Sequence, residues 1–213
     1  MTTKLIPFQP PIVILGNGQY PRHPAALDIL STAGTIICTD GSADKALENG
    51  IQPDIIIGDL DSTKINKKSF KGRVIQIPEQ DNTDMAKTLE WCQTKGLKEI
   101  SILAATGIRE DHTLANLYLL AEFCENLSLR LVTNYSIITC HLGKRTFQSV
   151  KGQLVSIIPL HPADKLSTIG LRYPLTDETL KSSSQGISNL AQGSEFTVEC
   201  TGKVWVFRSY RQE

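Results

Sequence analysis

Residues 54–62 read DIIIGDLDS. The apolar run at 54–57 predicts a short strand buried in a sheet, and Asp59 and Asp61 follow it, two positions apart. Side chains at i and i+2 point the same way while the backbone stays extended, so we expect both carboxylates to face one hard cation. Mg²⁺ suits this arrangement, because it binds one or two protein carboxylates together with phosphates and water. The alternative for this pair alone is a polar turn with two solvated acids.

The same pattern recurs three more times in the first half of the chain. The apolar runs and the acidic segments that follow them are 36–39 with Asp40-Gly41, 74–77 with 80–84, and 100–105 with 106–112. In open α/β sheets, ligands bind in the crevice outside the carboxyl ends of the strands. The recurrence favours one shared ligand site over four independent surface turns.

The composition excludes several classes of protein. The 213 residues carry 22 basic and 22 acidic side chains, so no basic excess indicates a nucleic acid or a membrane as partner. No stretch approaches the ~20 apolar residues of a membrane span, and residues 1–7 lack the apolar core of a secretory signal. The five cysteines are scattered without metal-ligand spacing, so we expect a reduced, cytoplasmic setting.

Hydrophobic periodicity predicts two domains. Strands alternate with helices up to about residue 133, which indicates a Rossmann-like parallel sheet in a first domain at 1–138. Short strands without useful helices follow, which predicts an all-β sandwich domain at 139–213. The expected strands are 12–15, 36–39, 54–57, 74–77, 100–105 and 129–133, then 137–142, 146–150, 154–159, 195–200 and 203–210, with a hairpin turn at Thr201-Gly202. The expected helices are 24–33, 42–49, one from Thr83 to near Gly96, and about 112–124.

Asp84 and Lys87 lie three apart on the helix that Thr83 is expected to cap, so they share a face. One interpretation is a local ion pair on a solvated helix. The other places Asp84 on a metal ion and Lys87 on a phosphate, since a helix N-terminus attracts anions. An acid at that position repels phosphate unless a cation lies between them. The abundance of acids therefore indicates phosphate together with Mg²⁺.

Arg109, Asp111 and His112 follow the predicted strand 100–105. Arg109 either holds a phosphate bidentately or makes a surface contact with Asp111. His112 is either a neighbour of a helix cap or a proton donor to a ligand. The chain has no P-loop motif, and it has neither the DFG nor the HRD element of protein kinases.

In the second half, Tyr173 and the pair Ser188-Asn189 combine an aromatic ring with small polar side chains, which suits a small-molecule site. The alternative is a half-buried strand at Tyr173 and ordinary turn chemistry at Ser188-Asn189.

Taken together, these segments closely resemble the thiamine pyrophosphokinase family. The matching segments are 40–43 (DGSA), 53–62 (PDIIIGDLDS), 81–87 (DNTDMAK), 105–116 (ATGIREDHTLAN), 170–175 (GLRYPL) and 186–189 (GISN). The resemblance implies an α/β catalytic domain, a β-sandwich domain that binds thiamine, and a homodimer with active sites between subunits. It also implies the reaction, in which ATP and thiamine give thiamine diphosphate and AMP with Mg²⁺.

The resemblance further implies roles for single residues. Those implied near the metal are Asp59, Asp61, Asp84 and Asp40; those near ATP are Asp40, Gln80, Thr83, Lys87, Arg109, Asp111 and His112; those near thiamine are Tyr173, Ser188 and Asn189. The residues implied in catalysis are Asp59, Asp61, Asp84, Lys87, Arg109 and Asp111. The chain departs from the family pattern at three positions, with Ser42 and Ala104 in place of usual glycines and Tyr173 where animal members carry Trp.

Two other functions remain open at this point. A pyrophosphokinase for another hydroxymethyl heterocycle, such as a pterin, would use the same N-terminal segments, and Tyr173 and Ser188 favour thiamine over it. A non-catalytic sensor of thiamine or nucleotide would not need the set Asp59, Asp61, Asp84, Lys87 and Arg109.

Overall fold

The computed structural model describes residues 8–61, 65 and 70–212. Residues 1–7, and Ser62 at the end of the opening stretch, lie outside the described residues. The chain divides into two compact units, unit 1 at residues 1–116 and unit 2 at residues 117–213. The division falls inside helix α4 (Glu110–Phe123). The predicted domain boundary at 138/139 stays a prediction.

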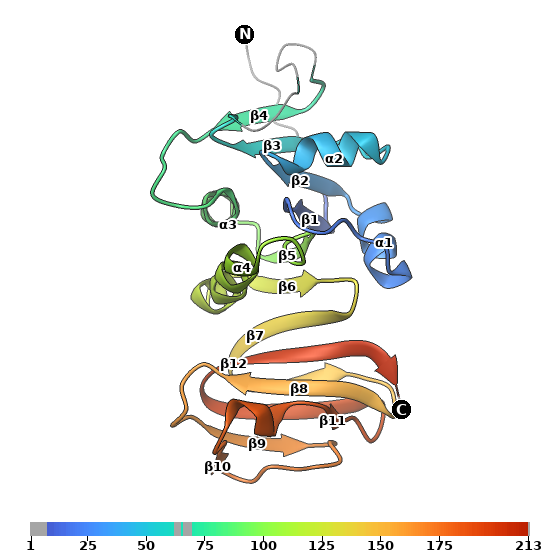
Figure 1. Cartoon of the computed structure of the whole chain (residues 1–213), viewed down its shortest axis with the longest axis vertical. Helices are drawn as coiled ribbons and strands as arrows, with labels where there is room; N and C mark the ends of the chain where they lie inside the picture. Colours follow the sequence, from blue (N-terminus) through green and yellow to red (C-terminus); the bar gives the residue numbers. More distant parts are fainter. Residues whose placement is uncertain (1–7, 62–64, 66–69, 213) are drawn as a thin grey trace. The chain divides into compact units, whose positions relative to one another are not determined.

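Unit 1 holds a parallel sheet of strands in the order β5-β1-β2-β3-β4 (Figure 1). The bounds are β1 Ile12–Leu15, β2 Thr35–Thr39, β3 Ile55–Gly58, β4 Arg73–Gln76 and β5 Glu99–Leu103. The central strands are apolar on both faces, as β3 shows, with Ile55, Ile56 and Ile57 all buried. Continuous burial of this kind requires helices on both faces of a parallel sheet.

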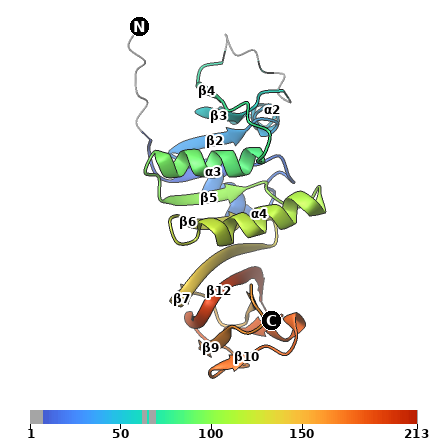
Figure 2. The same ribbon diagram turned by 90° about the vertical axis from the view of Figure 1, so that its left-hand side faces the viewer.

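The helices of unit 1 supply that cover. Helices α1 (Pro24–Ser31) and α2 (Ser42–Glu48) lie on one face of the sheet, and α3 (Asp84–Thr94) lies on the other (Figures 1 and 2). Helix α3 begins where the sequence predicts, because the hydroxyl of Thr83 accepts a hydrogen bond of 3.3 Å from the N–H of Ala86.

The chain path places a topological switch point between β1 and β5, because β2, β3 and β4 lie on one side of β1 and β5 lies on the other. Here the loops that leave the two strands pack backbone against backbone. A Cβ on Gly18 would lie 2.5 Å from the carbonyl oxygen of Thr106, which leaves no room for a side chain. The rule for open α/β sheets predicts a ligand at this point.

Unit 2 is built from antiparallel strands. Their bounds are β6 Ser128–Val132, β7 Ser136–Gln148, β8 Gln153–Pro159, β9 Lys165–Ile169, β10 Glu178–Thr179, β11 Asn189–Leu190 and β12 Glu195–Gln212, with a short 3₁₀ helix, η1, at Ser183–Gly186. Strand β12 pairs with β7 along most of its length, and its other edge pairs first with β9 and then with β8. The predicted fold class, a Rossmann-like domain followed by a β-sandwich, is confirmed.

The predicted hairpin turn at Thr201-Gly202 is wrong. Strand β12 runs through it, and the register with β7 shifts between Cys200 and Lys203, so two extra residues form a bulge. The break expected at Gly143-Lys144 in β7 is also absent, and Gly143, with φ of +75°, lies directly opposite Cys200. Glycine composition indicates a turn at each place, but the two irregularities face each other and keep one long strand pair intact.

Candidate active site

Three carboxylates meet at the carboxyl edge of the sheet in unit 1. Asp40 follows β2, and Asp59 and Asp61 follow β3. One carboxylate oxygen from each lies within 4.8 Å of the others. Asp40 is fully buried, Asp59 is half-buried and Asp61 is exposed, so the group opens from the protein interior toward solvent.

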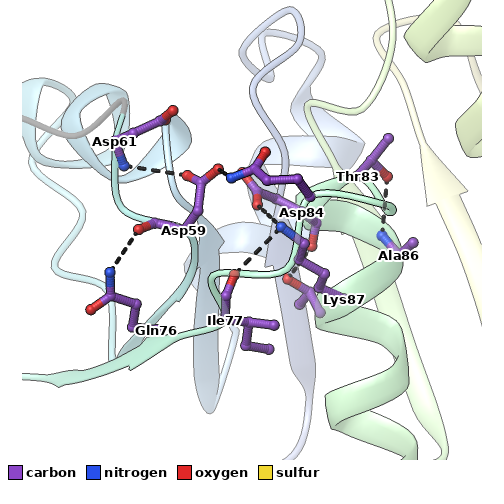
Figure 3. A network of polar contacts seen from close by, with 10 residues as sticks. Asp59, Asp61, Gln76, Ile77, Thr83, Asp84, Ala86 and Lys87 are labelled. Carbon is purple, nitrogen blue, oxygen red and sulfur yellow. Dashed lines mark hydrogen bonds and ion pairs between the residues drawn. The ribbon is translucent and has the colours of Figure 1, made fainter.

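A tight turn, and not an extended backbone, makes Asp59 and Asp61 converge. Leu60, between them, has φ of +69°, in the left-handed region that a side chain other than glycine adopts at a cost of about 1–2 kcal/mol. The N–H of Asp61 donates to Oδ1 of Asp59 at 3.3 Å (Figure 3). The expectation of an i, i+2 extended pair is therefore wrong in its backbone, although the carboxylates do meet.

Gly58 makes room for two of the acids. A Cβ at this position would lie 2.6 Å from the Cβ of Asp40 and 3.1 Å from Oδ1 of Asp84. Asp84, at the start of α3, is therefore adjacent to the three clustered acids. Gly58 is not among the site residues predicted from the sequence, although a glycine between a buried strand and an acid is a signal for close approach.

Asp84 and Lys87 form an ion pair with an Nζ–Oδ1 distance of 3.7 Å (Figure 3). Lys87 is only 2% exposed, and its ammonium also donates to the carbonyl oxygen of Ile77 at 3.4 Å. The predicted pair exists, but the interpretation as a solvated helix face is wrong. A buried ammonium held in place is a fixed positive charge beside the acids.

Hydrogen bonds and burial set the charges of the acids. The Gln80 amide, which donates to Oδ2 of Asp59 at 2.8 Å, and the N–H of Asp61 lower the pKa of Asp59. Partial burial raises the pKa of Asp84, which the Lys87 ammonium opposes and the charges of Asp59 and Asp40 reinforce. The group therefore concentrates negative charge next to one ammonium.

This donor set fits Mg²⁺. Carboxylate oxygens are the ligands that this hard cation prefers, and a cation relieves the mutual repulsion of acids in a half-buried site. Asp40, Asp59 and Asp61 would hold it, with Asp84 beside them.

A cationic cavity of about 270 Å³ lies at the switch point of the same sheet edge. Its charged and polar lining comprises Asn17, Lys45, Thr106, Arg109, His112, Thr113 and Asn116. Lys45 on α2 donates to the carbonyl oxygen of Asn17 at 3.1 Å, so its ammonium is fixed over the loop that follows β1. Lys45 is not among the site residues predicted from the sequence, although its place on the helix just after Asp40 was an available signal.

Arg109 and Asp111 form an exposed pair at the rim of this cavity. Nε of Arg109 donates to Oδ1 of Asp111 at 3.1 Å, and the two side chains are 64% and 65% exposed. Arg109 lowers the pKa of Asp111 to about 2, and the N–H of His112 also donates to this carboxylate, at 2.9 Å. The surface-contact interpretation describes this pair as it stands in the structure.

In unit 2, Tyr173 is 60% exposed and lies in the segment after β9, so the interpretation as a half-buried strand residue is wrong. Asn189, at the start of β11, contacts the backbone of Tyr173 through its side chain. Ser188 has φ of +59°, and its N–H donates to the hydroxyl of Ser156 at 3.0 Å. These residues therefore form one cluster within unit 2.

Comparisons with known proteins match the two regions of the chain separately. A family model described as the catalytic domain of thiamin pyrophosphokinase matches residues 26–133, and a model described as its vitamin B1 binding domain matches residues 141–205. The chain belongs to the thiamine pyrophosphokinase family. Asp40, Asp59, Asp61 and Asp84 lie within the first match, as does the cavity lining from Lys45 to Asn116, whereas Asn17 and Gly18 of the cavity lie before it.

Individual proteins similar to this chain are also named thiamine pyrophosphokinases. Thiamin pyrophosphokinase 1 of Caenorhabditis elegans is 28% identical over 68% of this chain and 66% of its own length. Thiamine pyrophosphokinase of Bacillus subtilis is 30% identical over 62% of this chain and 65% of its own length. These alignments thus span slightly less than two thirds of either relative. The crystal structure of the Bacillus subtilis protein superposes with a TM-score of 0.79 at 29% identity, covering 93% of this chain and 98% of that one.

In the described part of the chain, no helix has the length and apolar character needed to cross a membrane.

Proposed function

We propose that this protein is a thiamine pyrophosphokinase, which transfers the pyrophosphoryl group of ATP to the hydroxyl of thiamine. The thiamine oxygen forms a bond to the β-phosphorus, the bond from that phosphorus to the α,β-bridging oxygen breaks, and AMP leaves while the hydroxyl loses its proton. The observation that carries the proposal is the cluster of Asp40, Asp59 and Asp61 beside Asp84 and Lys87. Family membership supports the same reaction.

ATP is proposed to bind along the carboxyl edge of the sheet in unit 1. The cavity at the switch point supplies Lys45, Arg109 and His112 to an anionic nucleotide. Lys87 supplies a fixed positive charge on the phosphate side, and Gln80 holds Asp59 in its ionised form. The hydroxyl of Thr83 caps α3, so its contribution to ATP binding is to hold the helix N-terminus that carries Asp84 and Lys87.

Asp40, Asp59 and Asp61 would hold Mg²⁺, with Asp84 as a further candidate ligand. When bound, this cation neutralises phosphate charge and polarises the phosphoryl oxygens. The residues themselves contribute position: Gly58 leaves the space in which Asp40 and Asp84 approach each other, and the turn at Leu60 directs Asp61 back to Asp59. Positioning and charge neutralisation supply most of the rate in phosphoryl transfer.

Thiamine is proposed to bind at the cluster of Tyr173, Ser188 and Asn189 in unit 2. Thiamine carries a fixed positive charge, and an aromatic face attracts such a cation. The Tyr173 ring is exposed and already has the guanidinium of Arg172 over it, at 5.6 Å from the ring centroid. The match of residues 141–205 to a vitamin B1 binding domain supports this location.

The oligomeric state and the cellular location complete the proposal. We propose a homodimer with active sites between subunits, on the strength of the family resemblance. Mixing Asp61→Asn protein with Tyr173→Ala protein, assayed at thiamine well below the KM of Tyr173→Ala, tests this. A shared site gives mixed dimers more activity than either variant alone, and a site within one chain does not. We also propose a cytoplasmic location, which the five cysteines support, since none of them forms a disulfide.

Product analysis tests the reaction. The protein is incubated with Mg²⁺, ATP and thiamine, and the products are separated by chromatography. AMP and thiamine diphosphate in equal amounts are expected. Equal amounts of ADP and thiamine monophosphate would refute pyrophosphoryl transfer, and turnover of a hydroxymethyl pterin in place of thiamine would assign the other heterocycle. Binding of thiamine without any product would indicate a sensor.

A further inference from the structure

The side chain of Asn189 is almost fully used on the backbone of its neighbours. Its Oδ1 accepts from the N–H of Tyr173 at 3.0 Å and from the N–H of Leu190 at 2.8 Å. Its Nδ2 donates to the carbonyl oxygen of Tyr173 at 2.7 Å. An amide group offers two donor hydrogens and one carbonyl oxygen, so one donor hydrogen remains for any other partner.

These bonds make Asn189 a substitute for a missing strand. The segment before Tyr173 pairs with the chain after Asn189, through a bridge between Leu171 and Ala191 and a 2.8 Å bond from the N–H of Arg172 to the carbonyl oxygen of Leu190. At Tyr173 this pairing continues through the Asn189 side chain, which satisfies both the N–H and the C=O of that residue. The Tyr173 backbone is therefore fixed at a point where the chain has left the strand.

The opposite is true of the Tyr173 ring, which is 60% exposed. A ring on a mobile loop would give up part of its stacking free energy to become ordered when a ligand binds, whereas a fixed backbone removes that cost. Ser188 orients Asn189 toward Tyr173. The backbone of Ser188 is left-handed, and its N–H donates a 3.0 Å hydrogen bond to the hydroxyl of Ser156 in β8.

We propose that Asn189 is a positioning residue, which holds the Tyr173 ring in place for the acceptor substrate and does not itself bind that substrate. The proposal rests on the proposed function, because the acceptor is taken to be thiamine. It changes the role of Asn189 from a ligand of thiamine to the support of the residue that contacts it.

A double-mutant cycle tests this proposal. Equilibrium binding of thiamine is measured by calorimetry for wild type, Asn189→Ala, Tyr173→Ala and the double variant, with circular dichroism to check the fold and Asn126→Ala, an exposed asparagine of unit 2, as control. Each single change is expected to weaken thiamine binding several-fold and to leave the KM for ATP unchanged. The double variant is expected to bind no more weakly than Tyr173→Ala. Multiplied effects in the double variant would show that Asn189 contacts thiamine on its own and would overturn the proposal.

The variant N189D supplies a readout that a general loss of packing does not give. A carboxylate still accepts from the N–H groups of Tyr173 and Leu190, but only the protonated form donates to the carbonyl oxygen of Tyr173. Thiamine affinity of N189D, divided by that of wild type at the same pH, is therefore expected to rise as the pH falls from 6.0 to 4.0, toward the ordinary pKa of an aspartate, while the same ratio for Asn189→Ala stays level. Level ratios for both variants would refute the positioning role.

Failure of the inference and failure of the proposed function give different results. A wild-type protein that neither binds thiamine nor forms thiamine diphosphate would refute the proposed function. A wild-type protein that does both, with independent effects of Asn189 and Tyr173, would refute the positioning role alone.

Discussion

The two units solve the problem of holding a functional side chain in opposite ways. In unit 1, Asp40 and Lys87 are buried, and the backbone at Gly58 approaches Asp40 so closely that no side chain fits between them. In unit 2, Tyr173 is 60% exposed, and one amide side chain, that of Asn189, holds its backbone. The charged groups are fixed by strand ends and by helix α3, and the aromatic ring is fixed by a single side chain.

The difference follows from the chemistry that each part is proposed to perform. Electrostatic stabilisation of a phosphoryl group depends on charges that do not reorganise during the reaction, and buried strand ends provide such charges. Stacking on a cationic ring is worth less and contributes to the affinity for the ligand. Changes in unit 1 should therefore affect the rate of the reaction, and changes in unit 2 should affect the affinity for the acceptor.

Asp61→Asn tests the acidic cluster of unit 1 and has the largest expected effect. Removing one charge from the Asp40, Asp59 and Asp61 cluster should lower kcat by roughly 10²–10³-fold, as losses of single electrostatic contacts to a transition state do. Steady-state kinetics at saturating Mg²⁺ measures this. Asp28→Asn, an exposed acid on α1, is the matched control and should retain full activity. Near wild-type turnover of Asp61→Asn would contradict the proposed role of Asp61 as a ligand of Mg²⁺.

Gly58→Ala tests whether the close approach of the backbone to Asp40 is needed for activity, as the charges are. The added methyl group would lie 2.6 Å from the Cβ of Asp40, so Asp40 must shift. We expect kcat to fall by roughly 10–10²-fold and the free energy of unfolding by about 1–3 kcal/mol. Gly193→Ala, where a Cβ meets nothing within 4 Å, controls for the extra methyl group itself. Equal activity in the two alanine variants would mean that the packing at Gly58 is not needed for the reaction.

Tyr173→Ala tests the contribution of the aromatic ring in unit 2 to thiamine binding. Loss of the aromatic face should raise the KM for thiamine by roughly 2- to 30-fold and leave the KM for ATP nearly unchanged. Tyr173→Trp should be tolerated, because Trp has the stronger face. Tyr135→Ala removes another exposed tyrosine of unit 2 and should change neither constant. An unchanged KM for thiamine in Tyr173→Ala would move the search for the thiamine site to Ser188.

His141→Leu has the smallest expected effect and concerns the core of unit 2. His141 is buried in β7 beside Phe147, and burial lowers its pKa below the ordinary value of 6.5. The unfolded chain therefore binds a proton more readily, so folding stability falls as the pH drops below about 6.5. The difference in Tm between variant and wild type should shift in favour of the variant between pH 7.5 and 5.5, by less than about 4 °C.

Thermal unfolding by scanning fluorimetry over this pH range measures the effect. A difference in Tm that does not change with pH would show that His141 titrates equally in the folded and unfolded chain.

Much of unit 1 could be predicted because its signals are local. A buried parallel strand needs a continuous apolar run, as at residues 55–57, and a helix start needs a cap such as Thr83, so pattern and element coincide. Acids placed just after such runs come together because parallel strands end on one edge. Lys45 and Gly58 escaped notice, since their importance depends on contacts with the distant residues Asn17 and Asp40.

Parts of unit 2 could not be predicted, because each irregularity depends on contacts with residues distant in the sequence. Thr201-Gly202 has the composition of a hairpin turn, and only the facing position of Gly143 in β7 turns it into a bulge within a continuous strand. The segment around Tyr173 lacks a strand pattern because the Asn189 side chain replaces the partner strand there. Such pairings join residues far apart in the chain, and periodicity within one segment does not report them.

The central position of β12 governs the order in which the molecule can be made. Unit 1 and the helix α4 that ends it are synthesised by residue 123, whereas β7, β8 and β9 all pair with β12, which spans Glu195–Gln212. Domains fold as units during synthesis, and non-local strand pairing is slow. On the ribosome, unit 1 can therefore fold while the edges of β7, β8 and β9 that pair with β12 are still open.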